Sequence, residues 1–300
     1  MLKVENLKKE FDKKTAVDNI SFEVTEGRIF GLLGPNGAGK TTTIRTVLNI
    51  IKPTSGSISF NGKPITEDFF NYIGYLPEER GLYRKSKVID VIIYFAQLKG
   101  IEKRDAIKRG DQWLKRLTIS NYRDNRIEEL SKGNQQKIQF ISAVLHEPKL
   151  LILDEPFSGF DPINQMLIKD VILSFVDSGK VVILSTHQME TAEKMCRDIL
   201  LINNGKEVIK GDLNEVKKRF GGNYVKLSFS GDASFLNSLP YVLHTENFSN
   251  YAEIQLKDDK APHEFLKDIA NRLQINHFSV IDPTLNKIFI DAINKTGLAV

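Results

Sequence analysis

The stretch Gly34-Pro35-Asn36-Gly37-Ala38-Gly39-Lys40-Thr41, followed by Thr42, decides the fold of this 300-residue chain. It has the form G-x-x-x-x-G-K-[ST], in which glycines allow a loop to wrap a phosphate with its own backbone N–H groups. Lys40 is expected to reach the β- and γ-phosphates, and the Thr41 hydroxyl to coordinate Mg²⁺. A glycine-rich turn with an exposed lysine is the alternative. The context favours the phosphate loop, because an apolar strand (29–33) precedes it and a helical pattern (41–50) follows.

Two further short apolar runs, 150–153 and 181–184, flank a helical pattern at 165–176. Strands that are apolar on both faces and alternate with helices indicate a buried parallel sheet. Residues 20–24 and 58–60 instead alternate apolar and polar positions, and the second stretch leads into an Asn61-Gly62 hairpin turn. The pattern from 88 to 117 is helical and heavily charged. The sequence therefore predicts an α/β core with a mostly helical insertion.

A domain boundary is predicted near Phe220-Gly221-Gly222. The formal charge is +6 up to residue 220 and −2 beyond it, which together give the net +4. The last eighty residues alternate short strands and helices in the order of a split βαβ unit. We therefore expect one domain at 1–220, with its helical insertion at about 85–145, and a small α+β domain at 221–300.

Polar side chains follow two of the predicted parallel strands where each strand ends. The strand at 150–153 leads into Asp154 and Glu155, and the strand at 181–184 leads into His187. The carboxyl ends of parallel strands meet at one sheet edge, where such folds bind ligands. We expect Asp154 to hold Mg²⁺ through water, Glu155 to orient or deprotonate an attacking water, and His187 to contact a γ-phosphate. The alternatives are a pair of solvated loop acids and a structural histidine.

Composition excludes several classes of protein. The charge of +4, from 42 basic and 38 acidic residues, rules out a polycation and does not require a nucleic-acid partner. The single Cys196 excludes an internal disulfide and favours a reducing compartment. No apolar run exceeds six residues, even counting glycine, against the roughly 20 that a membrane helix needs. The N-terminus has no apolar h-region, so we expect no signal peptide and a cytoplasmic location.

The segment Leu130-Ser131-Lys132-Gly133-Asn134 resembles the signature motif of ABC-type ATPases, usually written LSGGQ. The phosphate loop, Asp154-Glu155, Ser158-Gly159-Phe160-Asp161 and His187 stand in that family's order, so the resemblance covers residues 1 to about 215. It implies a P-loop ATPase core with a mixed sheet, an antiparallel β subdomain and a helical insertion. It also implies that two such domains sandwich two ATP molecules with Mg²⁺, head to tail, so that Ser131, Gly133, Asn134 and Asp161 serve a nucleotide.

The chain departs from the family pattern at two places. Glu78 takes the place of the family's usual glutamine in the loop that joins the sheet to the helical insertion. Its carboxylate is expected to bind Mg²⁺, and it would repel the γ-phosphate unless the metal or Arg80 offsets its charge. Lys132 and Asn134 replace the signature's usual Gly and Gln. Phe11 matches the family's early aromatic and is a candidate to stack on adenine, with a place in the strand core as the alternative.

The resemblance implies an ATP-hydrolysing subunit that works with a separate polytopic membrane permease, from the inner face of the cell membrane. An export-type subfamily is expected, in which this chain forms a homodimer or pairs with another ATP-binding subunit. Two alternatives stay open: a soluble ABC ATPase acting on ribosomes or DNA, and a dimer that ATP holds together without turnover. No nucleic-acid partner is expected, and residues 221–300 are predicted to serve dimer contact or regulation.

Overall fold

The computed structural model describes residues 1–12, 14–79, 81–221, 223–248, 250–257 and 261–296. The chain forms two compact units, which divide between Lys210 and Gly211. This division lies before the boundary predicted at residue 220, because helix α7 (Leu213–Phe220) belongs to the second unit, where it contacts helix α9 (Leu285–Thr296).

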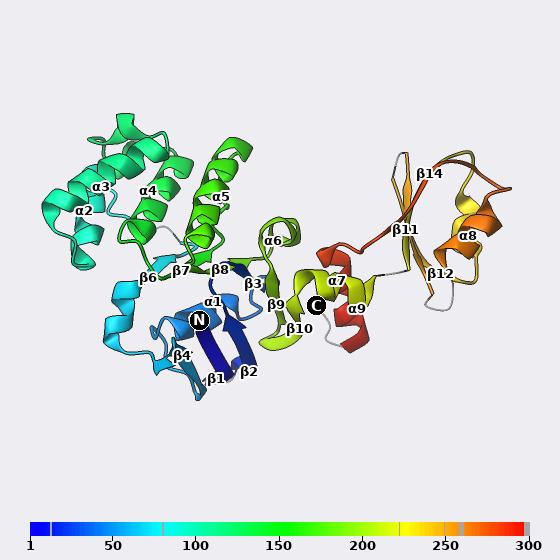
Figure 1. Ribbon diagram of the computed structural model, residues 1–300, viewed down its shortest axis with the longest axis horizontal. Coiled ribbons are helices and arrows are strands. Elements are labelled where there is room, and N and C mark those ends of the chain that lie inside the picture. The colour runs from blue at the N-terminus through cyan, green and yellow to red at the C-terminus, as the bar shows by residue number, and fades with distance from the viewer. Residues whose placement is uncertain (13, 80, 222, 249, 258–260, 297–300) are drawn as a thin grey trace. The chain divides into compact units, whose positions relative to one another are not determined.

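A six-stranded sheet forms the centre of the first unit (Figure 1). Its order is β10 (Lys206–Asp212), β9 (Asp198–Asn203), β3 (Ile29–Leu33), β8 (Val181–Thr186), β7 (Leu150–Asp154) and β6 (Ile73–Leu76). The strands from β9 to β6 are parallel. Every residue of β3, β7 and β8 is buried, which confirms the parallel sheet that the apolar runs predict. The carboxyl ends of these three strands therefore meet at one edge.

A smaller antiparallel sheet packs against one face of the central sheet. Its order is β2 (Lys14–Val24), β1 (Leu2–Phe11), β4 (Ser55–Phe60) and β5 (Lys63–Pro64). Helix α1 (Lys40–Val47) shares their core through Ile44 and Val47. The predicted hairpin turn joins β4 to β5, with φ of 50° at Asn61 and 75° at Gly62. This sheet is the expected antiparallel β subdomain.

Helices form the insertion between β6 and β7 (Figure 1). They are α2 (Val88–Leu98), α3 (Lys103–Arg116), the 3₁₀ turns η2 (Ser120–Tyr122) and η3 (Ile127–Glu129), and α4 (Lys132–Val144). The helical pattern at 88–117 makes two helices because Gly100, at φ 78°, turns the chain. The remaining helical elements of the unit are η1 (Glu67–Tyr72), α5 (Pro162–Asp177) and α6 (Met189–Met195). Within the described part of the chain, no helix is long and apolar enough to cross a bilayer.

The second unit contains a four-stranded antiparallel sheet with the order β12 (Val242–Asn247), β13 (Ala252–Leu256), β11 (Tyr224–Ser230) and β14 (Gln274–Ile281). Helix α8 (Pro262–Ile269) and the 3₁₀ turn η4 (Ser234–Ser238) contribute Phe265 and Leu236 to its core. This confirms the split βαβ prediction, with the first helix reduced to a 3₁₀ turn. Helix α9, which the sequence reading did not assign, is tied to β11 by a hydrogen bond from the Tyr224 hydroxyl to Asp291 (2.7 Å).

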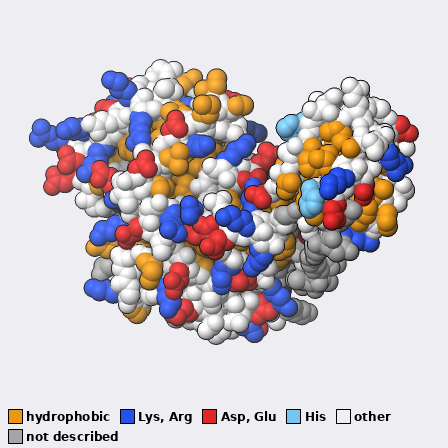
Figure 2. Space-filling model, turned by 45° about the vertical axis from the view of Figure 1, so that its right-hand side comes forward, with side chains coloured by type: hydrophobic (Ala, Val, Ile, Leu, Met, Phe, Trp, Pro, Cys, Tyr) orange, Lys and Arg blue, Asp and Glu red, His pale blue; other side chains and the backbone are white. Residues whose placement is uncertain are grey.

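Charged side chains cover the surface in mixed patterns. On the face drawn in Figure 2, basic and acidic side chains are interspersed over the larger unit, and hydrophobic side chains gather on the smaller one. A mixed surface of this kind is ordinary for a protein with a small net charge.

Candidate nucleotide-binding site

The phosphate loop joins the end of β3 to the start of α1 and needs glycine for steric reasons. Gly39, the N-cap of α1, has φ 107°, and a Cβ there would lie 2.4 Å from the carbonyl oxygen of Ala16. Gly34 has φ 147°, and its Cβ would lie 2.2 Å from the carbonyl oxygen of Ile202. Ala38, within the loop, is itself buried. The surrounding backbone therefore holds the loop in a shape that only glycine permits at these two positions.

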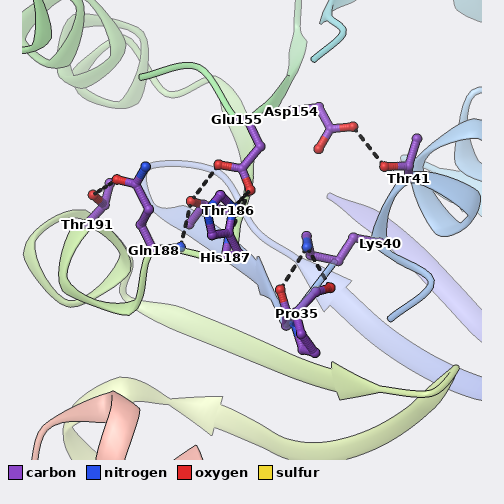
Figure 3. Close-up of polar contacts among 10 residues, drawn as sticks. Pro35, Lys40, Thr41, Asp154, Glu155, Thr186, His187, Gln188 and Thr191 are labelled. Atoms are coloured by element: carbon purple, nitrogen blue, oxygen red, sulfur yellow. Dashed lines mark hydrogen bonds and ion pairs between the residues drawn. The ribbon is translucent and has the colours of Figure 1, made fainter. Parts of the chain in front are cut away.

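Lys40 lies in the loop with its side chain almost fully buried, at 6% exposure. Its Nζ donates hydrogen bonds to the carbonyls of Gly34 (2.7 Å) and Pro35 (3.1 Å), as Figure 3 shows. Burial lowers the pKa of Lys40, and the nearby carboxylates Glu155, Asp154 and Glu78 oppose that shift. The loop thus holds an ammonium group beside three carboxylates, which suits a site that receives an anion together with a metal.

Thr41 and Asp154 meet at the same edge, from α1 and β7 (Figure 3). The Thr41 hydroxyl donates to Oδ2 of Asp154 (3.2 Å). Asp154 is 1% exposed, and its Oδ1 has no hydrogen-bond partner among the described residues. Desolvation is the main cause that raises the pKa of Asp154. A buried oxygen without a partner beside a hydroxyl fits Mg²⁺ or its bound water, because Mg²⁺ takes oxygen ligands and retains waters.

The described residues contain no group of three or more His, Cys, Asp or Glu side chains placed to hold a metal. Thr41 and Asp154 suit a Mg²⁺ ion that has few protein ligands and completes its coordination with phosphate oxygens. Glu78 influences the pKa of Asp154 through its charge. Arg80, the predicted counter-charge for Glu78, lies outside the described residues.

The Glu155 carboxylate, 5% exposed, is held by β8 and the residue that follows it. Thr186 Oγ1 donates to Oε2 (3.0 Å), and the backbone N–H of His187 donates to Oε1 (2.8 Å). The Nδ1 atom of His187 lies 2.6 Å from the same Oε1 (Figure 3). Glu155 has φ 49°, a backbone conformation that costs energy in a residue other than glycine and is found at functional sites. The structure thus pairs His187 with Glu155 and leaves Nε2 as the ring nitrogen that can face a phosphate.

A cleft of about 400 Å³ brings most of the predicted residues together. Phe11 is 45% exposed at its rim, so the alternative place in the strand core is wrong. Its ring lies 4.8 Å from Lys9 Nζ. The described residues that line the cleft are Phe11, Lys14, Ala16, Asn36, Gly37, Gly39, Lys40, Thr41, Thr42, Glu78, Asp154 and Glu155. Sequence reasoning missed Lys14 and Ala16, which reach the cleft only because β2 packs beside the loop.

The signature residues lie elsewhere, at the start of α4. Ser131 is the N-cap of that helix and accepts a hydrogen bond from the backbone N–H of Asn134 (3.3 Å). Gly133 lies beside the Ser158–Asp161 segment, because a Cβ there would be 3.9 Å from the Gly159 carbonyl oxygen. None of these residues is among those that line the cleft. A single chain therefore presents the phosphate loop and the signature at separate places.

Asp161 is the N-cap of α5. Its Oδ1 accepts from the backbone N–H of Asn164 (2.9 Å), and its Oδ2 accepts from Nδ2 of the same residue (2.6 Å). These hydrogen bonds lower the pKa of Asp161, and the bond from the Asn164 backbone N–H contributes most. Its carboxylate caps α5 and, like the signature residues, lies outside the cleft of its own chain.

Sequence reasoning also missed two buried glutamines, Gln136 and Gln139, on α4. Their spacing from the apolar residues Ile138, Phe140 and Ile141 on the same helix is the pattern that could have found them.

Comparisons with known proteins agree with this geometry. The profile of the family described as "ABC transporter" matches residues 17–158, and that of "ATP-binding protein DrrA1-3-like, C-terminal domain" matches residues 211–293. The uncharacterized ABC transporter ATP-binding protein YhaQ of Bacillus subtilis is 44% identical over 98% of each chain. The Nod factor export ATP-binding protein I of Cupriavidus metallidurans is 33% identical over 72% of each chain.

Among solved structures, an ATP-binding subunit of an ABC transporter superposes with a TM-score of 0.69 at 29% identity, covering 73% of this chain and 93% of that one. The first unit thus has the fold of an ABC ATPase cassette, and the identity to YhaQ extends through the second unit. The chain belongs to the family of ABC transporter ATP-binding proteins.

Proposed function

We propose that this chain hydrolyses ATP, with Mg²⁺, to drive export through a separate polytopic permease. The observation that carries the proposal is the convergence of Lys40, Thr41, Asp154 and Glu155 on one cleft. The first three suit phosphate and metal binding, and the fourth is a carboxylate placed one residue after the metal-binding position. A protein that only bound nucleotide would not need Glu155.

The residues have distinct tasks in this proposal. The Lys40 ammonium exchanges its bonds to Gly34 and Pro35 for β- and γ-phosphate oxygens. Thr41 and Asp154 would hold Mg²⁺, and the bound ion would supply positive charge to offset the charge that develops on the phosphates. Glu155 accepts a proton from the attacking water. Thr186 and His187 hold its carboxylate in place, and His187 acts as an imidazolium, with Nδ1–H donating to Glu155 and Nε2–H donating to the γ-phosphate. Phe11 stacks on adenine at the rim.

A head-to-tail dimer accounts for the second group of residues. Ser131, Gly133 and Asn134 stand at the N-terminus of a 13-residue helix, where free N–H groups and the helix dipole attract anions. Because they lie outside the cleft of their own chain, they serve the nucleotide of a second chain. The partner is a second copy or a paired ATP-binding subunit.

The names of related proteins support the proposed permease partner and the proposed direction of transport. The Nod factor relative is named for export, and the chain itself has no helix among the described residues that could span a bilayer. A subunit that works with such a permease would lie in the cytoplasm, on the inner face of the membrane. The helical insertion and the loop at 78–86 are the proposed contacts with the permease.

The substitution Glu155→Gln tests the proposed hydrolysis. It removes the general base and retains the hydrogen-bonding shape, so phosphate release should fall by about 10²–10⁴-fold, and a dimer should accumulate with ATP in size-exclusion chromatography. Glu190→Gln, at an exposed position of α6, is the control and should keep wild-type turnover. Equal hydrolysis by the wild type and Glu155→Gln would show that Glu155 is not the base.

Purification from detergent-solubilised membranes tests the coupling. A polytopic membrane protein should be retained with the full-length chain in the presence of ATP. Recovery only with ribosomes or DNA would contradict the export proposal and favour a soluble ABC ATPase.

A further inference from the structure

Two glutamines are buried on one side of helix α4. Gln136 and Gln139 are each 7% exposed, and their spacing of three residues places them on the same face. The other buried positions nearby on the helix are apolar, among them Ile138, Phe140 and Ile141, except for Lys137, whose Nζ donates to the Leu117 carbonyl (3.0 Å). Buried amides in such surroundings need hydrogen-bond partners, so their contacts show what they hold.

Both side chains bind backbone carbonyls of the catalytic loops. Gln136 Nε2 donates to the carbonyl of Pro156 (3.2 Å), the residue directly after Glu155. Gln139 Nε2 donates to the carbonyls of Glu79 (2.9 Å) and Pro77 (3.4 Å), which stand on either side of Glu78. A carbonyl oxygen only accepts, so the amide nitrogen must be the donor in each contact.

The amide of Gln136 is costly where it lies. Its Oε1 is buried and has no hydrogen-bond partner among the described residues. A buried acceptor without a partner destabilises the folded state, and an apolar side chain of similar shape would avoid that cost. Stability alone therefore does not account for a glutamine here, whereas control of the Glu155 segment does.

Helix α4 also begins at the signature, with Ser131 as its N-cap. The same rigid element thus carries the proposed contact with the second chain's nucleotide and holds both loops of its own chain's cleft. We infer that Gln136 and Gln139 are positioning residues that tie the signature end of α4 to the segments carrying Glu155 and Glu78. The inference rests on the proposed ATP hydrolysis.

Two substitutions test the hydrogen bonds of Gln136 and Gln139 separately. Gln136→Met removes the donor to the Glu155 segment at nearly constant volume and should lower kcat about tenfold, with KM for ATP unchanged. Gln139→Met frees the Glu78 loop and should raise the Mg²⁺ concentration for half-maximal turnover about fivefold, with a smaller effect on kcat. Ser142→Ala is the control and should change neither quantity, because among the described residues that hydroxyl bonds only to the Ile138 carbonyl of its own helix (3.0 Å).

Hydrogen exchange checks the positioning without relying on activity. Amide exchange should increase at 154, 155, 157 and 158 in Gln136→Met and at 78 and 79 in Gln139→Met, each in its own loop and not in the other; Pro77 and Pro156 have no amide hydrogen. If a Met variant does not fold, the Asn variant, which shortens the donor by one methylene, should give the same changes. Wild-type kinetics and exchange in folded variants would overturn the inference. A wild type that fails to hydrolyse ATP would instead overturn the proposed function.

A double-mutant cycle tests the link to the signature end. If α4 couples the two sites, the fold-loss of turnover in the double variant Ser131→Ala/Gln136→Met should be several-fold smaller than the product of the fold-losses in the two single variants. The reason is that both substitutions disturb the same helix. Effects that multiply would show that α4 does not join the two sites.

Discussion

At Asp154, burial disfavours the charged carboxylate that the proposed metal binding needs. The carboxylate lies in the core at the end of β7, with one oxygen bonded to Thr41 and the other without a partner among the described residues. Because burial disfavours the charged form, its pKa is raised in the folded state. A residue that costs stability in this way is typical of a functional site.

Asp154→Asn should stabilise the protein without nucleotide and abolish Mg²⁺-dependent turnover. Removing the charge should raise the free energy of unfolding by about 1–2 kcal/mol at neutral pH. The pKa of Asp154 is higher in the folded protein than in the unfolded chain. The wild type therefore loses stability as the pH rises from the unfolded-state pKa of this carboxyl through its folded-state pKa. The advantage of the variant is therefore full at neutral pH and shrinks at acid pH. Urea unfolding from pH 3 to pH 7 measures the difference in unfolding free energy between Asp154→Asn and the wild type, with the exposed Asp170→Asn as control. A difference that does not change with pH would contradict a raised pKa at Asp154.

Glu78 is the residue in which this chain departs from its family's pattern. It faces the cleft, and its negative charge acts on both Asp154 and Lys40. A carboxylate there strengthens attraction for a divalent cation and repels phosphate that arrives without one.

Glu78→Gln should therefore weaken Mg²⁺ binding and make ATP binding less dependent on the metal. We expect the Mg²⁺ concentration for half-maximal turnover to rise about fivefold, which corresponds to about 1 kcal/mol. Titration of ATPase activity with Mg²⁺ at saturating ATP measures this. Glu79→Gln, its exposed neighbour outside the cleft, should match the wild type. A lower Mg²⁺ requirement in Glu78→Gln would show that the carboxylate does not assist the metal.

The elements around the phosphate loop could be predicted because their patterns are local. Continuous apolar runs gave β3, β7 and β8, and the G-x-x-x-x-G-K-T spacing gave the loop between β3 and α1. The pattern did not reveal why each glycine is needed. Gly39 is required because β2 brings the Ala16 carbonyl against it, and that approach joins residues distant in the sequence.

Gly39→Ala should unfold or severely destabilise the first unit, whereas Gly37→Ala should not. At Gly39 a Cβ adds a backbone clash to the positive φ, for a cost of about 3 kcal/mol or more. Gly37 also has positive φ (78°), but nothing lies within 4 Å of a Cβ there, so the cost is about 1 kcal/mol. Urea unfolding without nucleotide compares the unfolding free energies of the two variants. Equal losses of unfolding free energy would mean that the loop moves away from Ala16 and relieves the clash.

The whole molecule consists of two units, and the position of their boundary decides where a fragment of the first unit should end. The sequence predicts the boundary from the glycine pair and the change of charge near residue 220. Helix α7 precedes that point but contacts α9, and its Leu213 and Val216 are buried. A chain ending at 220 would retain α7 without α9.

A fragment of residues 1–210 should therefore fold and bind ATP, and it should stay monodisperse at concentrations where a 1–220 fragment associates. The exposed apolar face of α7 in the longer fragment is the cause. Light scattering and thermal unfolding of both fragments give the comparison. If the shorter fragment does not fold while the longer one does, α7 belongs to the first unit. Turnover of 1–210 compared with the full chain also tests the proposed role of the second unit in dimer contact or regulation.

The sequence alone determined the parallel sheet, the phosphate loop, the helical insertion and the split βαβ order of the second unit. These follow from periodicity, glycine placement and motif spacing within short segments, where neighbouring residues decide the conformation. Only the tertiary structure decided that His187 pairs with Glu155, that Phe11 lies exposed at the rim, and that Gln136 and Gln139 hold the catalytic loops. Those contacts join residues far apart in the chain, and their geometry is set by how sheets and helices pack together, which no local pattern encodes.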